Sequence, residues 1–257
     1  MKNILQIFLL IIIPSAILAQ NGEYEKREFI RGTDTLRYRI LLPKNYKPKK
    51  KYPVVLFLHG SGERGSDNQA QLTHGGKLFS DPANMDKYPA FVIFPQCPAG
   101  NSWARGKGGP GRDGIREFAT DEPMTKPLLM VSQLMDSLSG TKSVDKKRLY
   151  IGGLSMGGFG TFDMLARKPI VFAAAFPICG GGDSTAAERY GKNFPIWVFH
   201  GGADPVVTPA NSRRMVTALK SAGANVKYSE YPGVGHDSWT NAFAEAELLP
   251  WLFSKKK

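Results

Sequence analysis

Short, nearly continuous runs of apolar residues recur along this chain. The runs lie at residues 53–58, 91–94, 149–151, 173–176 and 196–199, with a further candidate strand at 226–231. A strand that is covered on both faces of a sheet has this composition, because neither set of its side chains meets water. Apolar residues at helical spacing separate the runs, at residues 128–138, 156–167, 212–221 and 243–253. This alternation predicts an α/β fold with a mostly parallel sheet and helices on both faces.

Two further candidate strands precede this series. Residues 27–30 and 35–42 flank the turn residues 32–34, and in the second strand Tyr38 and Ile40 alternate with arginines. This pattern is typical of an antiparallel hairpin with one exposed face, so we expect it at the edge of the sheet. Because no internal repeat or low-complexity linker follows, we expect one domain over residues 20–257, without an insertion long enough to form a large cap.

The first 19 residues are typical of a signal peptide for export. Lys2 supplies a positive charge, residues 4–13 are almost entirely aliphatic, and residues 16–19 end in a small residue before polar Gln20. The apolar stretch is short for a membrane span, although a retained anchor helix is the alternative. We therefore expect removal of residues 1–19 and a secreted or periplasmic protein with no stable membrane insertion.

The net charge of +12 raises the question of nucleic-acid binding. The lysines concentrate at residues 47–51, 146–148 and 255–257, each beside an expected turn or chain end. No basic helix face and no nucleic-acid-binding motif accompanies them. We interpret these runs as solvated turns and expect no nucleic-acid partner; attraction to acidic polymers is the alternative.

Ser155 lies among glycines, between the apolar run 149–151 and the expected helix 156–167. The segment Gly153-Leu-Ser-Met-Gly157 fits the G-x-S-x-G pattern of a nucleophile elbow. In this strand-to-helix turn the serine hydroxyl projects from the carboxyl end of the sheet, and larger side chains two residues away would collide with the strand or the helix. A glycine-rich packing turn is the alternative, but the strand before and the helix after favour the elbow.

A serine hydroxyl becomes a good nucleophile only when a base takes its proton. The chain has four histidines. His59 and His200 each end an apolar run and are expected to hydrogen-bond nearby backbone, while His74 lies in a polar segment. His236 lies in a loop after the last strand and follows both the serine and a candidate acid, which is the chain order of such sites. We predict that His236 is the base, with a surface-loop histidine as the alternative.

The base needs a carboxylate that orients its ring. Asp204 follows the strand at 196–199 and precedes His236. Asp183, after the strand that follows the serine, is one rival, and Asp237 is the other, although a direct neighbour of His236 reaches its Nδ1 with difficulty. We favour Asp204; a turn aspartate before Pro205 is the alternative reading.

Acyl transfer also needs donors for the oxyanion. The expected donors are the backbone N–H of Met156 and that of Ser61, with Gly62 as the alternative to Ser61, in the segment after the strand at 53–58. Loss of one such donor typically costs ~3 kcal/mol of barrier. A glycine-rich turn without a role is the alternative.

No cofactor or metal is expected. Residues 106–111 match G-x-G-x-x-G, but they do not directly follow a strand and Pro110 interrupts them. No H-E-x-x-H signature occurs either.

With these residues in place, the chain resembles α/β-hydrolases from about Pro53 to Trp251. The stretches that carry the resemblance are LHGSGERG (58–65), FPQCP (94–98), GGLSMGG (152–158), HGGAD (200–204) and GVGHDSWTNAF (233–243). They resemble a bacterial group between the family 1 carbohydrate esterases, which include feruloyl and acetylxylan esterases, and predicted peptidases of the prolyl-oligopeptidase type. The resemblance implies the α/β-hydrolase fold and a small catalytic domain without a lid. The chain lacks the propeller domain of true prolyl oligopeptidases, which disfavours a peptidase function.

The strand order of that fold bears on Cys97 and Cys179. It separates the strands that precede them by three positions, about 14 Å at ~4.8 Å per strand. A disulfide requires Cα atoms within ~7 Å, so we expect two free, mostly buried thiols.

These observations favour a secreted serine esterase that acts on feruloyl or acetyl esters of plant polysaccharides, with acylated oligo- or polysaccharide as its partner. A serine peptidase and a non-catalytic carbohydrate-binding protein are the alternatives. Trp103 and Trp239 are candidates for clamping an aromatic acyl group or a sugar, or else they pack the roots of their loops. Arg64, Arg105 and Arg112 are candidate contacts to acidic sugars, with solvated surface as the alternative. The sequence does not indicate the oligomeric state.

Overall fold

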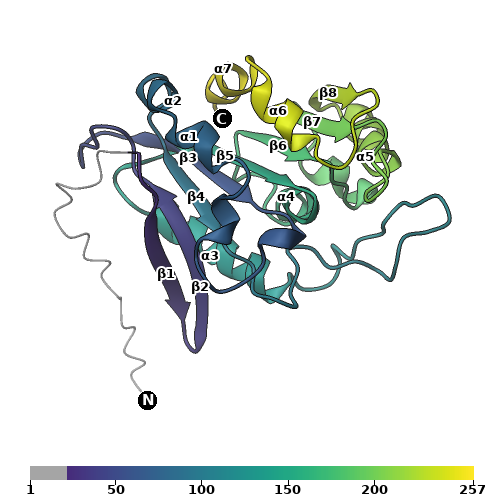
Figure 1. The fold of residues 1–257 in the computed structure, drawn as a ribbon, viewed down its shortest axis with the longest axis horizontal. Helices are drawn as coiled ribbons and strands as arrows, with labels where there is room; N and C mark the ends of the chain where they lie inside the picture. The colour runs from purple at the N-terminus through teal and green to yellow at the C-terminus, as the bar shows by residue number, and fades with distance from the viewer. Residues whose placement is uncertain (1–21) are drawn as a thin grey trace.

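The computed structural model describes residues 22–257, so the expected signal peptide at 1–19 lies outside the described residues. These residues build one eight-stranded sheet in the order β1-β2-β4-β3-β5-β6-β7-β8 (Figure 1). The strands are β1 (Glu25–Arg31), β2 (Asp34–Leu41), β3 (Tyr52–Leu58), β4 (Phe91–Pro95), β5 (Val144–Leu154), β6 (Ala174–Ile178), β7 (Pro195–Gly201) and β8 (Asn225–Tyr231). Strands β4, β3 and β5 to β8 run parallel, whereas β2 pairs antiparallel with both β1 and β4. The α/β-hydrolase fold with an antiparallel hairpin at its edge is confirmed.

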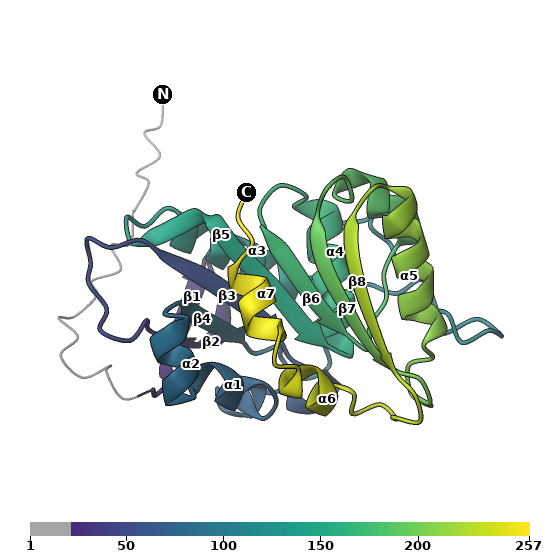
Figure 2. The same ribbon diagram turned by 90° about the horizontal axis from the view of Figure 1, so that it is seen from above.

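Helices cover both faces of the sheet (Figure 2). They are α1 (Gly76–Ser80), α2 (Pro82–Lys87), α3 (Lys126–Ser139), α4 (Met156–Arg167), α5 (Ala210–Ser221), α6 (Trp239–Ala244) and α7 (Leu248–Phe253). Side chains of α3, α4 and α5 share one apolar core with the sheet, and those of α1, α2, α6 and α7 share the other. Strand β3 contributes side chains to both cores, with Leu56 and Leu58 in the first and Val55 and Phe57 in the second. Such a strand is apolar throughout because it has no wet face.

The expectation of one continuous C-terminal helix over residues 243–253 is wrong. The structure has two short helices, because α6 ends at Ala244 and α7 begins only at Leu248. Pro250 explains the break. A proline lacks the N–H and its ring collides with the carbonyl four residues earlier, so it is tolerated only in the first turn of a helix.

The basic run at residues 146–148 lies inside β5 and not in a turn. Strand β5 begins at Val144, and Lys146 and Lys147 are exposed before the strand enters the core. The expected strand at 149–151 is therefore the buried middle of a longer one. The polar segment around His74 also carries α1, α2 and the short 3₁₀ helices η1 (Ser61–Glu63) and η2 (Ala70–Leu72), which periodicity does not predict.

A long segment between β4 and α3, residues 99–125, is called the arm below. It projects from the body of the molecule (teal in Figure 1). Its two sides meet where Ala119 N–H donates to Arg105 O and Lys107 N–H donates to Glu117 O. This pairing turns the arm back on itself and brings Arg116 and Phe118 toward the carboxyl end of the sheet.

Cys97 and Cys179 are free and buried, as expected. Their strands β4 and β6 are three positions apart in the sheet, which keeps the two thiols separate. Within residues 22–257, no helix has the length and apolar character needed to cross a bilayer.

Candidate active site

Ser155 lies in a sharp turn between β5, which ends at Leu154, and α4, which begins at Met156. Its φ of 51° and ψ of −115° belong to a region that non-glycine residues rarely adopt. A Cβ at Gly153 would lie 2.4 Å from Gly157 O, and one at Gly157 would lie 1.9 Å from Leu58 O. The turn therefore closes only with glycine at both positions. This is the geometry of the nucleophile elbow.

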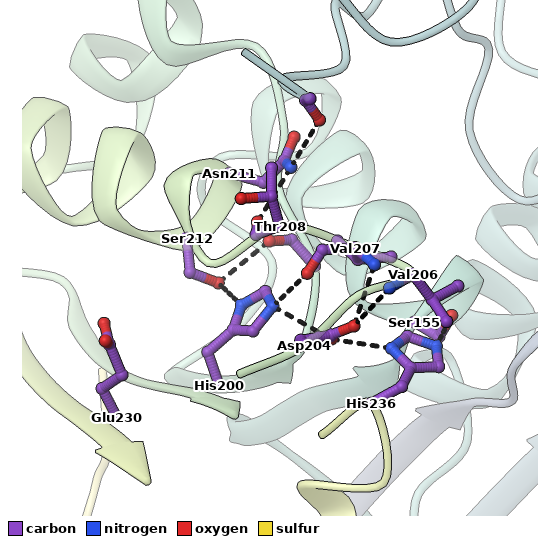
Figure 3. Close-up of polar contacts among 12 residues, drawn as sticks. Ser155, His200, Asp204, Val206, Val207, Thr208, Asn211, Ser212, Glu230 and His236 are labelled. Carbon is purple, nitrogen blue, oxygen red and sulfur yellow. Dashed lines mark hydrogen bonds and ion pairs between the residues drawn. The ribbon is translucent and has the colours of Figure 1, made fainter. Parts of the chain in front are cut away.

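Three side chains from distant parts of the chain form a hydrogen-bonded series (Figure 3). The Ser155 hydroxyl lies 2.9 Å from His236 Nε2, and His236 Nδ1–H donates to Asp204 Oδ2 over 2.7 Å. Ser155 follows β5, Asp204 follows β7 and His236 follows β8, so all three lie at the carboxyl ends of parallel strands. The sequence predicts this set of residues, and the structure brings them together in the geometry of a serine nucleophile, its base and the carboxylate that orients the base.

The Asp204 carboxylate is fully buried and is held from several directions. Its Oδ1 accepts the backbone N–H groups of Val206 and Val207, each at 2.9 Å. Nε2 of His200 lies 3.3 Å from Asp204 Oδ2 and donates to Val207 O at 2.8 Å. Burial lowers the pKa of His200. Buried carboxylates are normally stabilised by donors of this kind, and the fixed carboxylate in turn fixes the His236 ring.

The two rival acids lie elsewhere. Asp183 caps the 3₁₀ helix η3 (Ser184–Arg189), where it accepts the Thr185 N–H at 3.0 Å and a hydrogen bond from Thr120. Asp237 is exposed. The hydrogen bond at His236 Nδ1 goes to Asp204 instead.

His59 connects the loop after β3 with the end of β4. Its Nδ1–H donates to Gly60 O at 2.6 Å, and its Nε2 accepts the Cys97 N–H at 2.9 Å. The expected backbone bonding is confirmed. Because Nε2 faces a donor, only the neutral ring fits, and burial lowers the pKa of His59 to about 4. His59 thereby anchors the segment that carries Ser61.

Folding stability is expected to fall by about 3 kcal/mol between pH 6.5 and pH 4 because of His59. The unfolded chain takes up a proton near the ordinary pKa of 6.5, whereas the folded chain does so only near pH 4. The stabilisation is therefore complete above pH 6.5 and is lost as the pH falls. Urea denaturation of the wild type and of His59→Gln across this range measures the effect. Equal pH slopes for the two proteins would contradict it.

The expected oxyanion donors border the same cleft as the serine. Ser61, Ser155 and Met156 line a cleft of about 270 Å³. Met156 is the first residue of α4 and Ser61 is the first of η1, and the first N–H groups of a helix have no partner within it. These two N–H groups are therefore candidates to bind a developing negative charge, as the sequence predicts.

The two tryptophans differ. The expectation that Trp103 contacts a substrate is wrong, because its side chain is fully buried and its indole N–H donates to His59 O at 3.0 Å. It packs the root of the arm against Gly160. Trp239 is half-buried, with its ring edge-on to His236 at 5.4 Å between centroids and 5.0 Å from the ring of His74. It thus lies beside the proposed base.

Other cleft residues were not evident from the sequence. The structure adds Arg116 and Phe118 from the arm and Phe159 from the first turn of α4. Of the three arginines singled out from the sequence, Arg64 lines the cleft, whereas Arg105 forms an ion pair with Glu122. Of these residues, only Phe159 could have been found from the sequence. It lies in the first turn of α4, and that turn borders the nucleophile Ser155.

The arm is held against α5 by a buried amide. Asn211 Oδ1 accepts the Arg116 N–H at 2.9 Å, and its Nδ2 donates to Gly114 O at 3.2 Å. Replacement of Asn211 by alanine leaves these groups without their partner. We expect a loss of about 1–3 kcal/mol of folding stability and a raised KM for ester substrates. Urea denaturation and steady-state kinetics measure both quantities.

The exposed ion pair between Arg214 and Glu117, which also joins the arm to α5, provides the control. Arg214→Gln is expected to cost less than about 1 kcal/mol, because exposed ion pairs contribute little. A loss in Asn211→Ala no larger than in this control would contradict the importance of the amide.

Cys179, Asp204 and His236 offer ligand atoms within 4.8 Å of one another. Their chemistry does not fit a metal site. His236 Nδ1 already donates to Asp204, and burial raises the pKa of the Cys179 thiol, whereas a metal needs the thiolate. Burial also raises the pKa of Cys97 to about 12, so neither thiol is a reactive nucleophile at neutral pH.

Comparison with known proteins agrees with this geometry. The family model of phospholipases and carboxylesterases matches residues 45–248. The chain belongs to the phospholipase/carboxylesterase family. Among solved structures, a thermostable esterase shares 37% sequence identity with a TM-score of 0.81, over 93% of this chain and 64% of that one.

Two curated relatives of this phospholipase/carboxylesterase family member are a depolymerase and an acetylxylan esterase/xylanase by name. Poly(3-hydroxyalkanoate) depolymerase C of Paucimonas lemoignei is 28% identical over 64% of this chain and 43% of its own length. The bifunctional acetylxylan esterase/xylanase XynS20E of Neocallimastix patriciarum is 29% identical over 71% of this chain and 23% of its own length. The chain thus spans less than half the length of either relative. The family match and the solved esterase place the chain in a family of serine-hydrolase-type esterases.

Proposed function

We propose that this member of the phospholipase/carboxylesterase family is a secreted serine carboxylesterase that hydrolyses acetyl or feruloyl esters of plant polysaccharides. The observation that carries the proposal is the hydrogen-bonded series of Ser155, His236 and Asp204 at the edge of a cleft. The acetylxylan esterase named among the relatives and the export pattern of residues 1–19 support the choice of substrate and location.

The geometry supplies each step of ester hydrolysis. Ser155 Oγ attacks the ester carbonyl while its proton passes to His236 Nε2, and Asp204 stabilises the imidazolium that forms. The N–H groups of Met156 and Ser61 then hold the oxyanion. Collapse of the tetrahedral intermediate breaks the bond to the alcohol, which takes the proton from His236. Water then attacks the acyl-enzyme by the same route and regenerates Ser155.

The size of the cleft favours a small acyl group. Its volume of about 270 Å³ is below the range of roughly 300–1,000 Å³ typical for pockets that enclose drug-sized ligands. An acetyl group or a single aromatic ring is in keeping with this volume, whereas a long lipid chain is not. Phe118 and Phe159, with ring centroids 4.9 Å apart, supply an apolar wall for an aromatic group.

The proposal is tested by comparing the rates for methyl ferulate, 4-nitrophenyl acetate and a Xaa-Pro anilide with the purified mature enzyme. We expect both esters to be hydrolysed far faster than the anilide, and acid to be released from acetylated or feruloylated xylo-oligosaccharides. Enzyme treated beforehand with a fluorophosphonate is the control and should release none. Rapid anilide turnover with negligible ester cleavage would instead identify the peptidase.

A further inference from the structure

We propose that the cleft selects esters that carry a carboxylate near the scissile bond, and that Arg64 and Arg116 bind this carboxylate. The inference deepens the proposed esterase function and rests on it. A uronic acid or a dicarboxylic acid would supply such a group. The proposal starts from two cationic side chains that border the same cleft as Ser155.

The two arginines come from different elements, and Arg64 is exposed whereas Arg116 is partly buried. Arg64 follows η1 and donates to Ser61 O at 2.9 Å and to Asn101 O at 3.2 Å. Arg116 belongs to the arm, and its guanidinium carbon lies 6.0 Å from the centroid of the Phe159 ring. Because two carbonyls restrain the Arg64 side chain, it loses less conformational entropy when it binds a ligand, and its remaining N–H groups can still donate.

The charge of the cleft is not balanced. Its lining contains both arginines but no aspartate or glutamate. Within residues 22–257, several arginines form ion pairs with carboxylates, among them Arg105, Arg167, Arg213 and Arg214. Neither Arg64 nor Arg116 has a carboxylate within ion-pair distance in this part of the chain. The guanidinium group matches a carboxylate in shape as well as charge, so a carboxylate is the ligand that this pair fits.

The cleft also has an apolar wall. Ala104, Phe118, Phe159 and Val207 form a small buried cluster of their own. A ligand that fits both walls has a compact apolar part against the two rings and an anionic group directed at the arginines. Nearby low-polarity side chains also strengthen the attraction between charges.

Two matched pairs of esters test the proposal and separate the two possible positions of the carboxylate. On the acyl side, mono-(4-nitrophenyl) glutarate is compared with neutral 4-nitrophenyl pentanoate. On the alcohol side, 4-acetoxybenzoate is compared with its methyl ester. Rates are corrected for uncatalysed hydrolysis and measured with the wild type, Arg64→Gln, Arg116→Gln and the control Arg105→Gln, an arm arginine that pairs with Glu122 and does not line the cleft.

We expect the wild type to prefer the anionic ester in at least one pair by about 10-fold or more in kcat/KM. Arg64→Gln and Arg116→Gln should each reduce that preference, the ratio of kcat/KM for the anionic ester to that for the neutral ester, about 10-fold, mainly through the KM of the anionic ester. Arg105→Gln should retain the preference. A wild type that favours the neutral ester in both pairs would overturn the proposal, as would variants that lose both activities equally. If no ester is cleaved and no fluorophosphonate is incorporated, the esterase function itself fails.

Discussion

Replacement of Ser155 by alanine is expected to lower kcat for 4-nitrophenyl acetate by about 10⁶-fold. Ser155 Oγ is hydrogen-bonded to His236 Nε2 and is the atom that would form the acyl-enzyme. Without it, the remaining catalysis comes from substrate binding and the oxyanion donors alone. The expected remainder is therefore small but above the rate in water.

Kinetics and covalent labelling check this prediction together. A fluorophosphonate should label the wild type once and should not label Ser155→Ala. The double variant Ser155→Ala, His236→Ala should be no slower than the single variants, because residues that act as one unit are not additive. Full labelling of Ser155→Ala would show that another residue is the nucleophile, and absence of labelling in a folded wild type would favour a non-catalytic protein.

Replacement of Asp204 by asparagine is expected to lower kcat by about 10⁴-fold while the fold is retained. In the wild type, the Asp204 carboxylate accepts the His236 Nδ1–H at 2.7 Å, which leaves Nε2 free to take the serine proton. The asparagine amide can present an N–H to Nδ1 instead, and the ring then carries its proton on Nε2. In that tautomer His236 cannot accept the proton of Ser155.

The matched control is Asp183→Asn, which removes the charge of the rival acid at the start of η3. We expect its kcat to remain within a few-fold of the wild type. Urea denaturation of both variants separates lost catalysis from lost folding, because Asp204 also accepts the N–H groups of Val206 and Val207. A kcat for Asp204→Asn within 10-fold of the wild type would contradict the assignment of the acid.

The sequence could predict the core of the site because each part carries a local constraint. Gly153 and Gly157 surround Ser155 since any larger side chain would meet backbone atoms. Parallel strands bring their carboxyl ends to one edge of the sheet, so residues in the loops after β5, β7 and β8 can meet at that edge. Elimination among four histidines then left His236. Apolar runs predict the strands inside the sheet, and an alternating pattern with turn residues predicts the hairpin at its edge.

The walls of the cleft could not be predicted in this way. Arg116 and Phe118 reach the site only because the arm folds back and docks on Asn211, a contact between residues far apart in the sequence. Composition marks such a segment as a loop but does not say where it lies. For the same reason the sequence leaves open whether Trp103 contacts a substrate or packs the root of its loop, and in the structure it fills the space beside Gly160. The sequence of a loop does not show which of its aromatic side chains are buried.

The arm is a self-contained stretch of 99–125 that lines the cleft, whereas the reacting groups belong to the sheet framework. Divergence within the arm can therefore alter substrate choice while the nucleophile turn stays intact. In the laboratory, the same separation makes residues 99–125 a natural cassette for grafting. Its ends are fixed by β4 and α3, and a transplanted cassette needs to keep the backbone N–H and the backbone carbonyl that pair with the amide of Asn211.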